Sequence, residues 1–256
     1  MTDKPVSRRN LLLYAAGGLG AFVLGGSRWL SSTQWFAQVL DSEEVLTRHA
    51  QRWLGALQPN APEYTKADID PVFRTNGTTH PDTPAYHKMA SHGFRDWRLV
   101  VNGLVERPLK LSLRQIRQLP AQTQITRHDC VEGWSCIGQW TGARLSTVLE
   151  AARPKANARY VMFFCADRPG LGGQAYYESL AMREAYHPQT ILAYKLNGHT
   201  LPVPNGAPLR LRVPRQLGYK MAKYLMRIEV VESFSKIAGG HGGYWEDRGY
   251  SWYAGI

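Results

Sequence analysis

The densest group of reactive side chains is the run Arg-His-Asp-Cys-Val-Glu-Gly-Trp-Ser-Cys at residues 127–136. We predict that Cys130 ends a strand and begins a loop. A thiol in that position can ligate a metal or react, whereas a thiol inside an apolar strand is usually inert. Arg127 favours the thiolate form of Cys130, and Asp129 and Glu132 oppose it. Cys130 is therefore the first candidate for chemistry.

Spacing alone leaves several chemistries open for Cys130. In an oxidising compartment, a Cys130–Cys136 disulfide is as plausible as metal ligation. A zinc site built from His128, Cys130 and Cys136 lacks the usual second pair of ligands. A cysteine nucleophile needs a distant histidine as its base. Three histidines are available for that role: His187, His199 and His241.

Two further clusters have the composition of an anion site. Residues 197–214 contain two Asn-Gly turns, a proline-rich bend and the pair Arg210 and Arg212. Residues 218–223 combine a glycine, which lets a ligand approach the backbone closely, with two lysines. Rigid turns with cations suit an anionic ligand, although each cluster alone is equally typical of a turn with solvated basic residues. Neither cluster is a nucleotide-binding P-loop.

The elements that position these clusters belong to a mixed, β-rich α+β domain with short helices. Amphipathic patterns predict helices at 145–152 and 180–186, and a capping box from Ser112 to Gln115 predicts a helix that stops at Pro120. The strands are irregularly spaced, which excludes a βα repeat. The β-prone runs are 97–101, 109–111, 124–127, 160–165, 190–194, 209–213 and 224–231.

Composition divides the chain into four parts. Residues 1–35 are predicted as an export signal or anchor, 36–92 as a helical arm and loop, 93–235 as the catalytic core, and 236–256 as a glycine-rich and aromatic tail. Prolines in the stretch 60–92 predict an extended loop without a long regular element. Long ordered loops in compact proteins often wrap ligands, so we assign this loop to a bound ligand.

The N-terminus carries a targeting pattern. Ser-Arg-Arg-Asn-Leu-Leu at residues 7–12 resembles a twin-arginine export signal, and a glycine-containing apolar stretch follows it up to residue 24. This stretch is shorter than the roughly 20 apolar residues that span a bilayer. We therefore predict export to the periplasm, with retention by an uncleaved N-terminus as the alternative. Twin-arginine signals are typical of proteins that fold around a cofactor before export.

The positive charge is spread along the chain. The net charge is +11, but the sequence has no basic run with interleaved aromatic residues. Nucleic-acid binding is therefore not indicated, and an anionic cofactor or partner explains the excess better.

Together, the clusters resemble the molybdopterin-binding core of the sulfite oxidase superfamily. Three motifs are similar to that core in identity, order and spacing: Cys-Val-Glu-Gly-Trp-Ser at 130–135, Asn-Gly-Ala-Pro-Leu-Arg at 205–210 and Gly-Tyr-Lys-x-x-Lys at 218–223. The resemblance extends over roughly residues 70–232. It is greatest to the exported bacterial catalytic subunits of protein-methionine-sulfoxide reductase.

The resemblance implies roles for individual residues. Cys130 corresponds to the cysteine that ligates molybdenum, and Asn205 and Arg210 correspond to residues that hold the pterin phosphate region. The residues after the glycine turn are also implied in cofactor binding, and they are Met221, Ala222 and Lys223.

Two implied correspondences depart from the family pattern. Asn76, Thr79 and His80 correspond to a cofactor-binding loop, but Thr-Asn-Gly-Thr-Thr-His replaces the Asn-Asn-Phe-Tyr-Glu run of the reductase branch. The family's threonine after the central strand falls at Cys165, which by its apolar surroundings resembles an inert thiol. These departures concern the substrate more than the cofactor.

The implied function is two-electron oxygen-atom transfer by a molybdenum-molybdopterin enzyme, since soft thiolate sulfur suits a metal that changes oxidation state. We predict a reductase of sulfoxides or N-oxides. The alternatives are a sulfite-type oxidase and a cofactor-free, disulfide-stabilised binding module. The sequence has no haem, flavin or iron–sulfur motif, which implies a membrane cytochrome b-type or other redox partner protein. Trp134 is predicted either as a substrate-pocket wall or as a core tryptophan.

Overall fold

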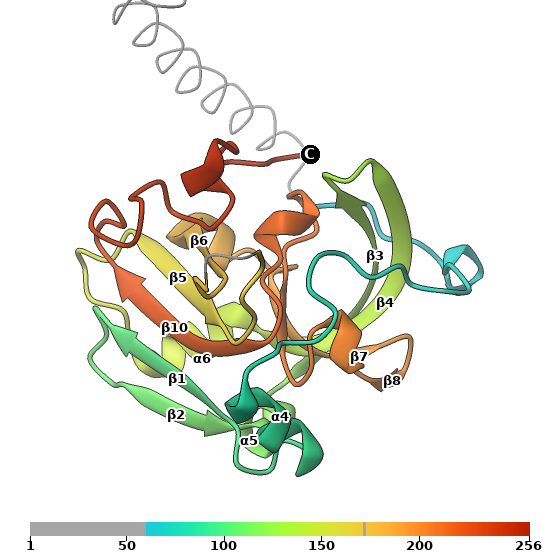
Figure 1. The fold of residues 1–256 in the computed structure, drawn as a ribbon, viewed down its shortest axis with the longest axis horizontal. Helices are drawn as coiled ribbons and strands as arrows, with labels where there is room; N and C mark the ends of the chain where they lie inside the picture. Colours follow the sequence, from blue (N-terminus) through green and yellow to red (C-terminus); the bar gives the residue numbers. More distant parts are fainter. Residues whose placement is uncertain (1–59, 171–172) are drawn as a thin grey trace, which may run out of the picture. The chain divides into compact units, whose positions relative to one another are not determined.

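The computed structural model describes residues 60–170 and 173–256 (Figure 1). The predicted export signal and helical arm lie outside these residues. Residues 60–256 belong to one compact unit, so the division at 93 and 236 stays a prediction. Within the described ranges, a search for helices of membrane-spanning length and hydropathy finds none.

The described residues form two five-stranded sheets. The first sheet has the order β2-β1-β10-β5-β6, in which β1 and β10 are parallel and the other neighbours antiparallel. Its strands are β1 (Arg98–Gly103), β2 (Leu109–Ser112), β5 (Tyr160–Cys165), β6 (Tyr177–Ala181) and β10 (Leu225–Val231). The second sheet has the order β3-β4-β7-β8, with β9 paired to β7. Its strands are β3 (Ala121–Cys130), β4 (Trp134–Arg144), β7 (Ile191–Leu196), β8 (His199–Thr200) and β9 (Arg210–Arg212).

Short helices connect the strands. The α-helices are α4 (Pro84–Ser91), α5 (Leu113–Gln118), α6 (Leu145–Ala152) and α7 (Met182–Ala185). The 3₁₀ helices are η2 (Lys66–Asp68), η3 (Val203–Asn205), η4 (Gly218–Lys220) and η5 (Glu246–Arg248). The mixed α+β, β-rich class predicted from the sequence is confirmed.

Several local predictions are confirmed. Ser112 and Gln115 form the predicted capping box at the start of α5. The Asn197-Gly198 pair connects β7 to β8, and both residues have positive φ, 49° and 80°. A two-residue turn with positive φ at both positions matches the twist of the strands that it joins. Cys130 is the last residue of β3, as predicted.

Other predictions are wrong. The stretch 60–92 contains α4, because Pro84 occupies the first turn, where a missing N–H costs nothing, and the Thr83 hydroxyl accepts from the Tyr86 amide. The predicted helix at 180–186 is shorter, since its first two residues end β6. Strand β6 escaped detection because polar Glu178 and Ser179 are buried within it and break the apolar pattern.

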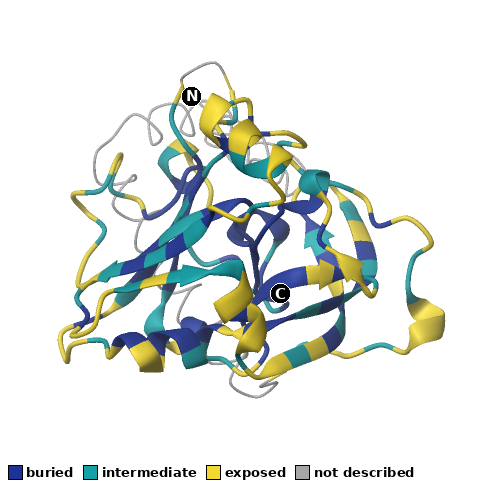
Figure 2. Cartoon of the chain, turned by 90° about the horizontal axis from the view of Figure 1, so that it is seen from below, coloured by how far each residue is buried: buried dark blue, intermediate teal, exposed yellow. Residues whose placement is uncertain are grey.

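The apolar interior has two parts. The larger cluster includes Trp97, Leu149 and Phe163, all fully buried, and it contains residues of both sheets. The smaller cluster, around Phe73 and Trp140, lies on the second sheet. Figure 2 shows buried residues on the central strands and exposed ones on the outer helices. Each fully buried side chain of this size contributes about 1.5–3 kcal/mol, so the two clusters fix the sheets that carry the site.

Candidate functional site

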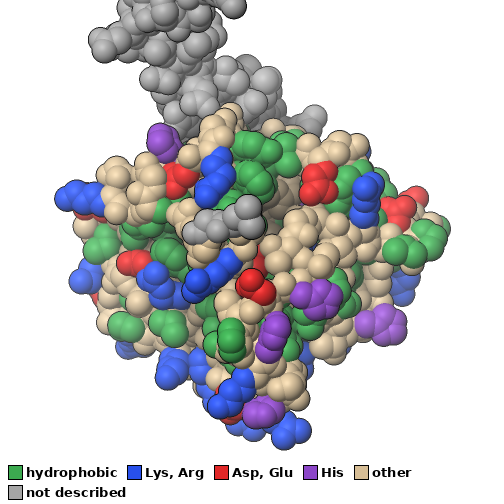
Figure 3. Space-filling view, viewed as in Figure 1, with side chains coloured by type: hydrophobic (Ala, Val, Ile, Leu, Met, Phe, Trp, Pro, Cys, Tyr) green, Lys and Arg blue, Asp and Glu red, His purple; other side chains and the backbone are tan. Residues whose placement is uncertain are grey.

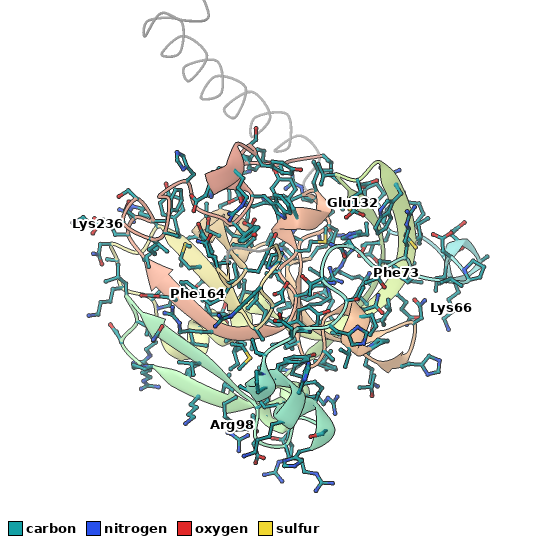
Figure 4. All side chains as sticks on the ribbon, in the orientation of Figure 1. Lys66, Phe73, Arg98, Glu132, Phe164 and Lys236 are labelled. Carbon is teal, nitrogen blue, oxygen red and sulfur yellow. The ribbon has the colours of Figure 1, made fainter. Side chains whose placement is uncertain are left out.

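The structure brings the Cys130 loop and the segment after η4 to one pocket of about 180 Å³. Cys130 reaches it from the end of β3, and Glu132, labelled in Figure 4, from the turn that follows. Met221 and Lys223 reach it from the chain between η4 and β10. Segments far apart in the sequence therefore meet around the thiol.

Cys130 is a buried free thiol, 8% exposed. Burial raises its pKa, whereas the positive charge of Arg74 lowers it. Arg127 is not the cation that acts on Cys130, because it forms an ion pair with Asp129 at 2.8 Å. Since a metal binds the thiolate, ligation by Cys130 releases a proton.

The alternatives for Cys130 find no support in the described part of the chain. In the β3–β4 ladder, Cys130 lies opposite Trp134 and Cys136 lies opposite His128, and both thiols are free. The Cys136 Sγ donates instead to the Val72 carbonyl, at 3.7 Å. Residues 60–170 and 173–256 also hold no group of three His, Cys, Asp or Glu side chains that could bind a metal. A zinc site is therefore not built here.

Two arginines of β9 are buried beside Trp140 and do not line the pocket. Arg210 and Arg212 are both 0% exposed and lie over the face of Trp140, at 4.9 and 4.5 Å from its ring centroid. Burial lowers the pKa of Arg210 to about 10, and burial together with Arg210 lowers that of Arg212. A guanidinium stays protonated in proteins, so these shifts express the cost of two buried positive charges.

The sequence offered His128 only as a possible zinc ligand, and the structure gives it a different role. It is fully buried, and its Nδ1 lies 2.8 Å from the Arg212 guanidinium, which can only donate. The proton therefore resides on Nε2, which has no partner. Burial, with Arg212 and other nearby cations, lowers the pKa of His128, so the ring is neutral. A Cβ at Gly218 would lie 2.5 Å from this Nε2, which explains the glycine.

Lys223 lines the pocket but directs its ammonium at the backbone. Its Nζ donates to the carbonyls of Asn76, Thr78 and Pro204, at 2.6, 2.5 and 3.0 Å. Burial and the charge of Arg210 lower its pKa to about 7. All three donors are thereby used, so Lys223 ties the 76–78 loop to the core.

Asp167 is a pocket residue that the sequence did not reveal. It lies just beyond β5, is 4% exposed, and its Oδ1 has no partner. Burial raises its pKa to about 6. The nearby Cys165, predicted in cofactor binding, lies in the apolar core and is not among the residues that line the pocket. An acidic residue two positions after a buried strand was the available signal.

Of the three residues that the resemblance implies in the 76–80 loop, Asn76 lines the pocket, whereas Thr79 and His80 do not. Asn76 and Thr78 line the pocket, and the buried Asn76 Oδ1 lacks a partner. Thr79 and His80 are exposed and contact each other, with the Thr79 hydroxyl 3.3 Å from the His80 Nδ1.

The remaining predicted residues do not line the pocket themselves. Asn205 is buried, accepts a hydrogen bond from Arg210 on its carbonyl, and leaves its Nδ2 without a partner. Ala222 is buried and accepts from the Leu211 amide, which joins this segment to β9. Trp134 is half-buried and donates from Nε1 to Glu132 at 2.9 Å, so it supports the loop and does not line the pocket.

The donor set fits an anionic, metal-bearing cofactor. Among the described residues, no carboxylate forms an ion pair with Arg210, Arg212 or Lys223. The buried Nε atoms of both arginines and the Asn205 Nδ2 also lack acceptors. Uncompensated buried cations with free donors require an anion such as a phosphate. Together with the soft thiolate in the pocket, these donors define a class: an enzyme whose metal is carried by a phosphorylated cofactor.

Comparison with known proteins gives the family. The oxidoreductase molybdopterin binding domain matches residues 85–237, which include β1 to β10. The chain therefore belongs to the sulfite oxidase-type, molybdopterin-binding oxidoreductases: it is an enzyme, and its cofactor is molybdenum-molybdopterin.

The chain is also similar to individual known proteins. A putative protein-methionine-sulfoxide reductase subunit YedZ1 from Azospira oryzae is 40% identical over 205 residues, 80% of this chain and 71% of the relative. The protein-methionine-sulfoxide reductase catalytic subunit MsrP from Ralstonia nicotianae is 34% identical over 244 residues, 88% of this chain and 69% of the relative. The sulfane dehydrogenase SoxCD from Paracoccus pantotrophus superposes with a TM-score of 0.49 at 24% identity, over 54% of this chain and 39% of that one.

Proposed function

We propose that this oxidoreductase reduces neutral sulfoxide-type substrates, with a methionine sulfoxide side chain as the reference substrate. The observation that carries the proposal is the charge of the pocket. Of the described residues that line it, only Glu132, Asp167 and Lys223 carry charge, and Lys223 spends its three donors on backbone carbonyls. A substrate anion such as sulfite would face two carboxyl groups, and the one lysine of the lining has no N–H left to donate to it.

The residues divide into those that hold the cofactor and those that face the substrate. Cys130 would provide the thiolate for the metal, and Arg210, Arg212 and Asn205 would hold the phosphate. The unpartnered Oδ1 of Asp167 is available to accept a hydrogen bond from the N–H groups of the pterin. When bound, the cofactor supplies two-electron oxygen-atom transfer. The reaction then consumes two protons and two electrons, and it converts a sulfoxide into a thioether and water.

The test compares two substrates on one preparation of holoenzyme. With reduced viologen dye as electron donor, we expect turnover of N-acetylmethionine sulfoxide. With ferricyanide as acceptor, we expect sulfite oxidation to be slower by at least about 100-fold in kcat/KM, since repulsion of a divalent anion by the pocket costs a few kcal/mol. Faster sulfite oxidation than sulfoxide reduction would replace this proposal with the sulfite-type oxidase.

We further propose that the enzyme is periplasmic and receives electrons from a membrane-bound partner protein of the cytochrome b type. The pattern at residues 7–12 supports export in the folded state. The names of the relatives, which describe subunits and catalytic subunits of a reductase, support a separate electron-donating subunit. On the face that Figure 3 shows, Lys and Arg side chains are scattered among acidic and apolar ones, which does not favour a polyanion as partner.

Export is tested by the double substitution Arg8→Lys and Arg9→Lys in the full chain. We expect the wild type in the periplasmic or membrane fraction and the variant retained in the cytoplasm with its cofactor bound, because the substitutions lie far from the folded core in sequence. Immunoblots of cell fractions measure the location of the protein, and molybdenum analysis measures whether its cofactor is bound. Unchanged export of the variant contradicts the twin-arginine route.

A further inference from the structure

Part of the pocket lining is built from aromatic residues of the C-terminal segment and of η4. Trp245 and Tyr250 line the pocket together with Tyr219 of η4. Trp245 and Tyr250 stack at 5.2 Å between ring centroids, and Tyr219 meets Tyr250 edge to face at 5.3 Å. We call these three residues the aromatic wall. The wall and Cys130 line the same cavity.

The segment that carries the wall is fixed along its length. The Leu217 amide donates to the Ala254 carbonyl at 2.9 Å, and the Ile256 amide donates to the Arg215 carbonyl at 3.0 Å. The Tyr219 hydroxyl donates to the Ser251 carbonyl at 2.7 Å. In Figure 1 the C-terminal segment, drawn in red, accordingly runs beside the orange segment of η4. These bonds hold the C-terminal segment, with Trp245 and Tyr250, against the η4 segment that leads to Met221.

A buried ion cluster secures the base of the wall. Lys220 is 1% exposed and bonds Glu178 of β6 at 2.5 Å and also Glu246, the neighbour of Trp245. Two carboxyl groups therefore surround this lysine, and its positive charge is not available to a substrate anion. The cluster joins the first sheet, η4 and the C-terminal segment at one point. It makes the wall a rigid surface, which a specificity surface requires.

We propose that the aromatic wall determines substrate specificity by packing against the hydrocarbon groups on either side of a sulfoxide sulfur. The inference rests on the proposed reductase function and adds a recognition surface to it. Aromatic rings pack well on methylene groups and make favourable contacts with sulfur, and they are neutral. Tyr250 is 37% exposed, so it stands at the mouth, where the longer arm of a methionine side chain enters.

The test uses Tyr250, whose exposure makes a folding defect on truncation less severe than at Trp245. With holoenzyme, we expect Tyr250→Ala to lower the ratio of kcat/KM for N-acetylmethionine sulfoxide to that for dimethyl sulfoxide about tenfold. Dimethyl sulfoxide has the same reacting group but only methyl arms. Tyr250→Phe keeps the ring and is expected to keep the ratio.

The matched control is Tyr186→Ala. Tyr186 is also 37% exposed but follows α7 and is not among the pocket-lining residues. We expect it to leave both kcat/KM values at the wild-type level. An unchanged ratio of the two kcat/KM values in Tyr250→Ala, whether or not both values fall, overturns the specificity role.

A binding measurement separates this inference from the proposed function. Calorimetric titration of holoenzyme with the thioether N-acetylmethionine requires no turnover, and we expect about tenfold weaker binding to Tyr250→Ala than to wild type or Tyr186→Ala. Wild-type enzyme that reduces no sulfoxide at all contradicts the proposed function. Equal affinity of wild type and Tyr250→Ala for the thioether contradicts the proposed role of the aromatic wall in specificity.

Discussion

Replacing Cys130 by serine is expected to lower molybdenum-dependent turnover by at least about 10³-fold, equivalent to ~4 kcal/mol of transition-state stabilisation. A serine hydroxyl is a harder ligand than a thiolate and stays protonated at neutral pH, so it cannot supply the sulfur that suits a redox metal. The fold should persist, because the change removes little volume at the end of β3. Steady-state kinetics measure the turnover of the exported protein, metal analysis its molybdenum content, and circular dichroism its fold.

The control is Cys136→Ser, in the same β-hairpin. Cys136 is 4% exposed, and its Sγ contacts the Val72 carbonyl at 3.7 Å. We expect normal turnover and a loss of stability of about 1 kcal/mol, because a buried hydroxyl replaces a small apolar group. Equal losses of molybdenum and activity in both variants would show that the hairpin, and not the Cys130 sulfur, is responsible.

Much of the site could be predicted from the sequence because its residues are consecutive. The Cys130 loop and the segments 205–210 and 218–223 are short motifs, each held by local turns, so their order along the chain is sufficient to recognise them. Strand β5 was predicted with its observed bounds, since its run of apolar residues is uninterrupted. Local signals were sufficient wherever local backbone geometry determines the structure.

The remainder depends on contacts between distant segments. Lys223 was expected to face the cofactor, but its donors satisfy carbonyls about 20 and 145–147 residues away in sequence. His128 acquires its role only where Arg212 lies against it, 84 residues further along the chain. Asp167 carries no motif around it. Long-range pairing of single side chains leaves no periodic pattern, so these roles follow only from the three-dimensional arrangement.

The buried ion cluster of Lys220, Glu178 and Glu246 is the clearest case of long-range pairing. Breaking it is expected to have a large effect on stability. We expect Lys220→Met to lower the free energy of unfolding of the holoenzyme by about 3–5 kcal/mol at pH 8, because it leaves two carboxyl groups buried without a cation. Burial and Glu246 already raise the pKa of Glu178, whereas Lys220 lowers it. Without Lys220 that pKa rises further. Urea unfolding followed by tryptophan fluorescence measures the change.

The pH dependence identifies the cause. The carboxyl group of Glu178 has a higher pKa in the folded protein than the unfolded value of about 4.3. Such a group contributes its full stabilisation of the folded state below about pH 4.3, and this contribution is lost as the pH rises through the folded-state pKa. The deficit of Lys220→Met should therefore be smaller at pH 5 than at pH 8. The triple variant Lys220→Met, Glu178→Gln, Glu246→Gln has no buried charge in the cluster and should recover most of the stability at pH 8. A deficit of equal size at both pH values, or no recovery in the triple variant, would assign the effect to lost packing and would leave the C-terminal segment held by its backbone hydrogen bonds and ring contacts instead.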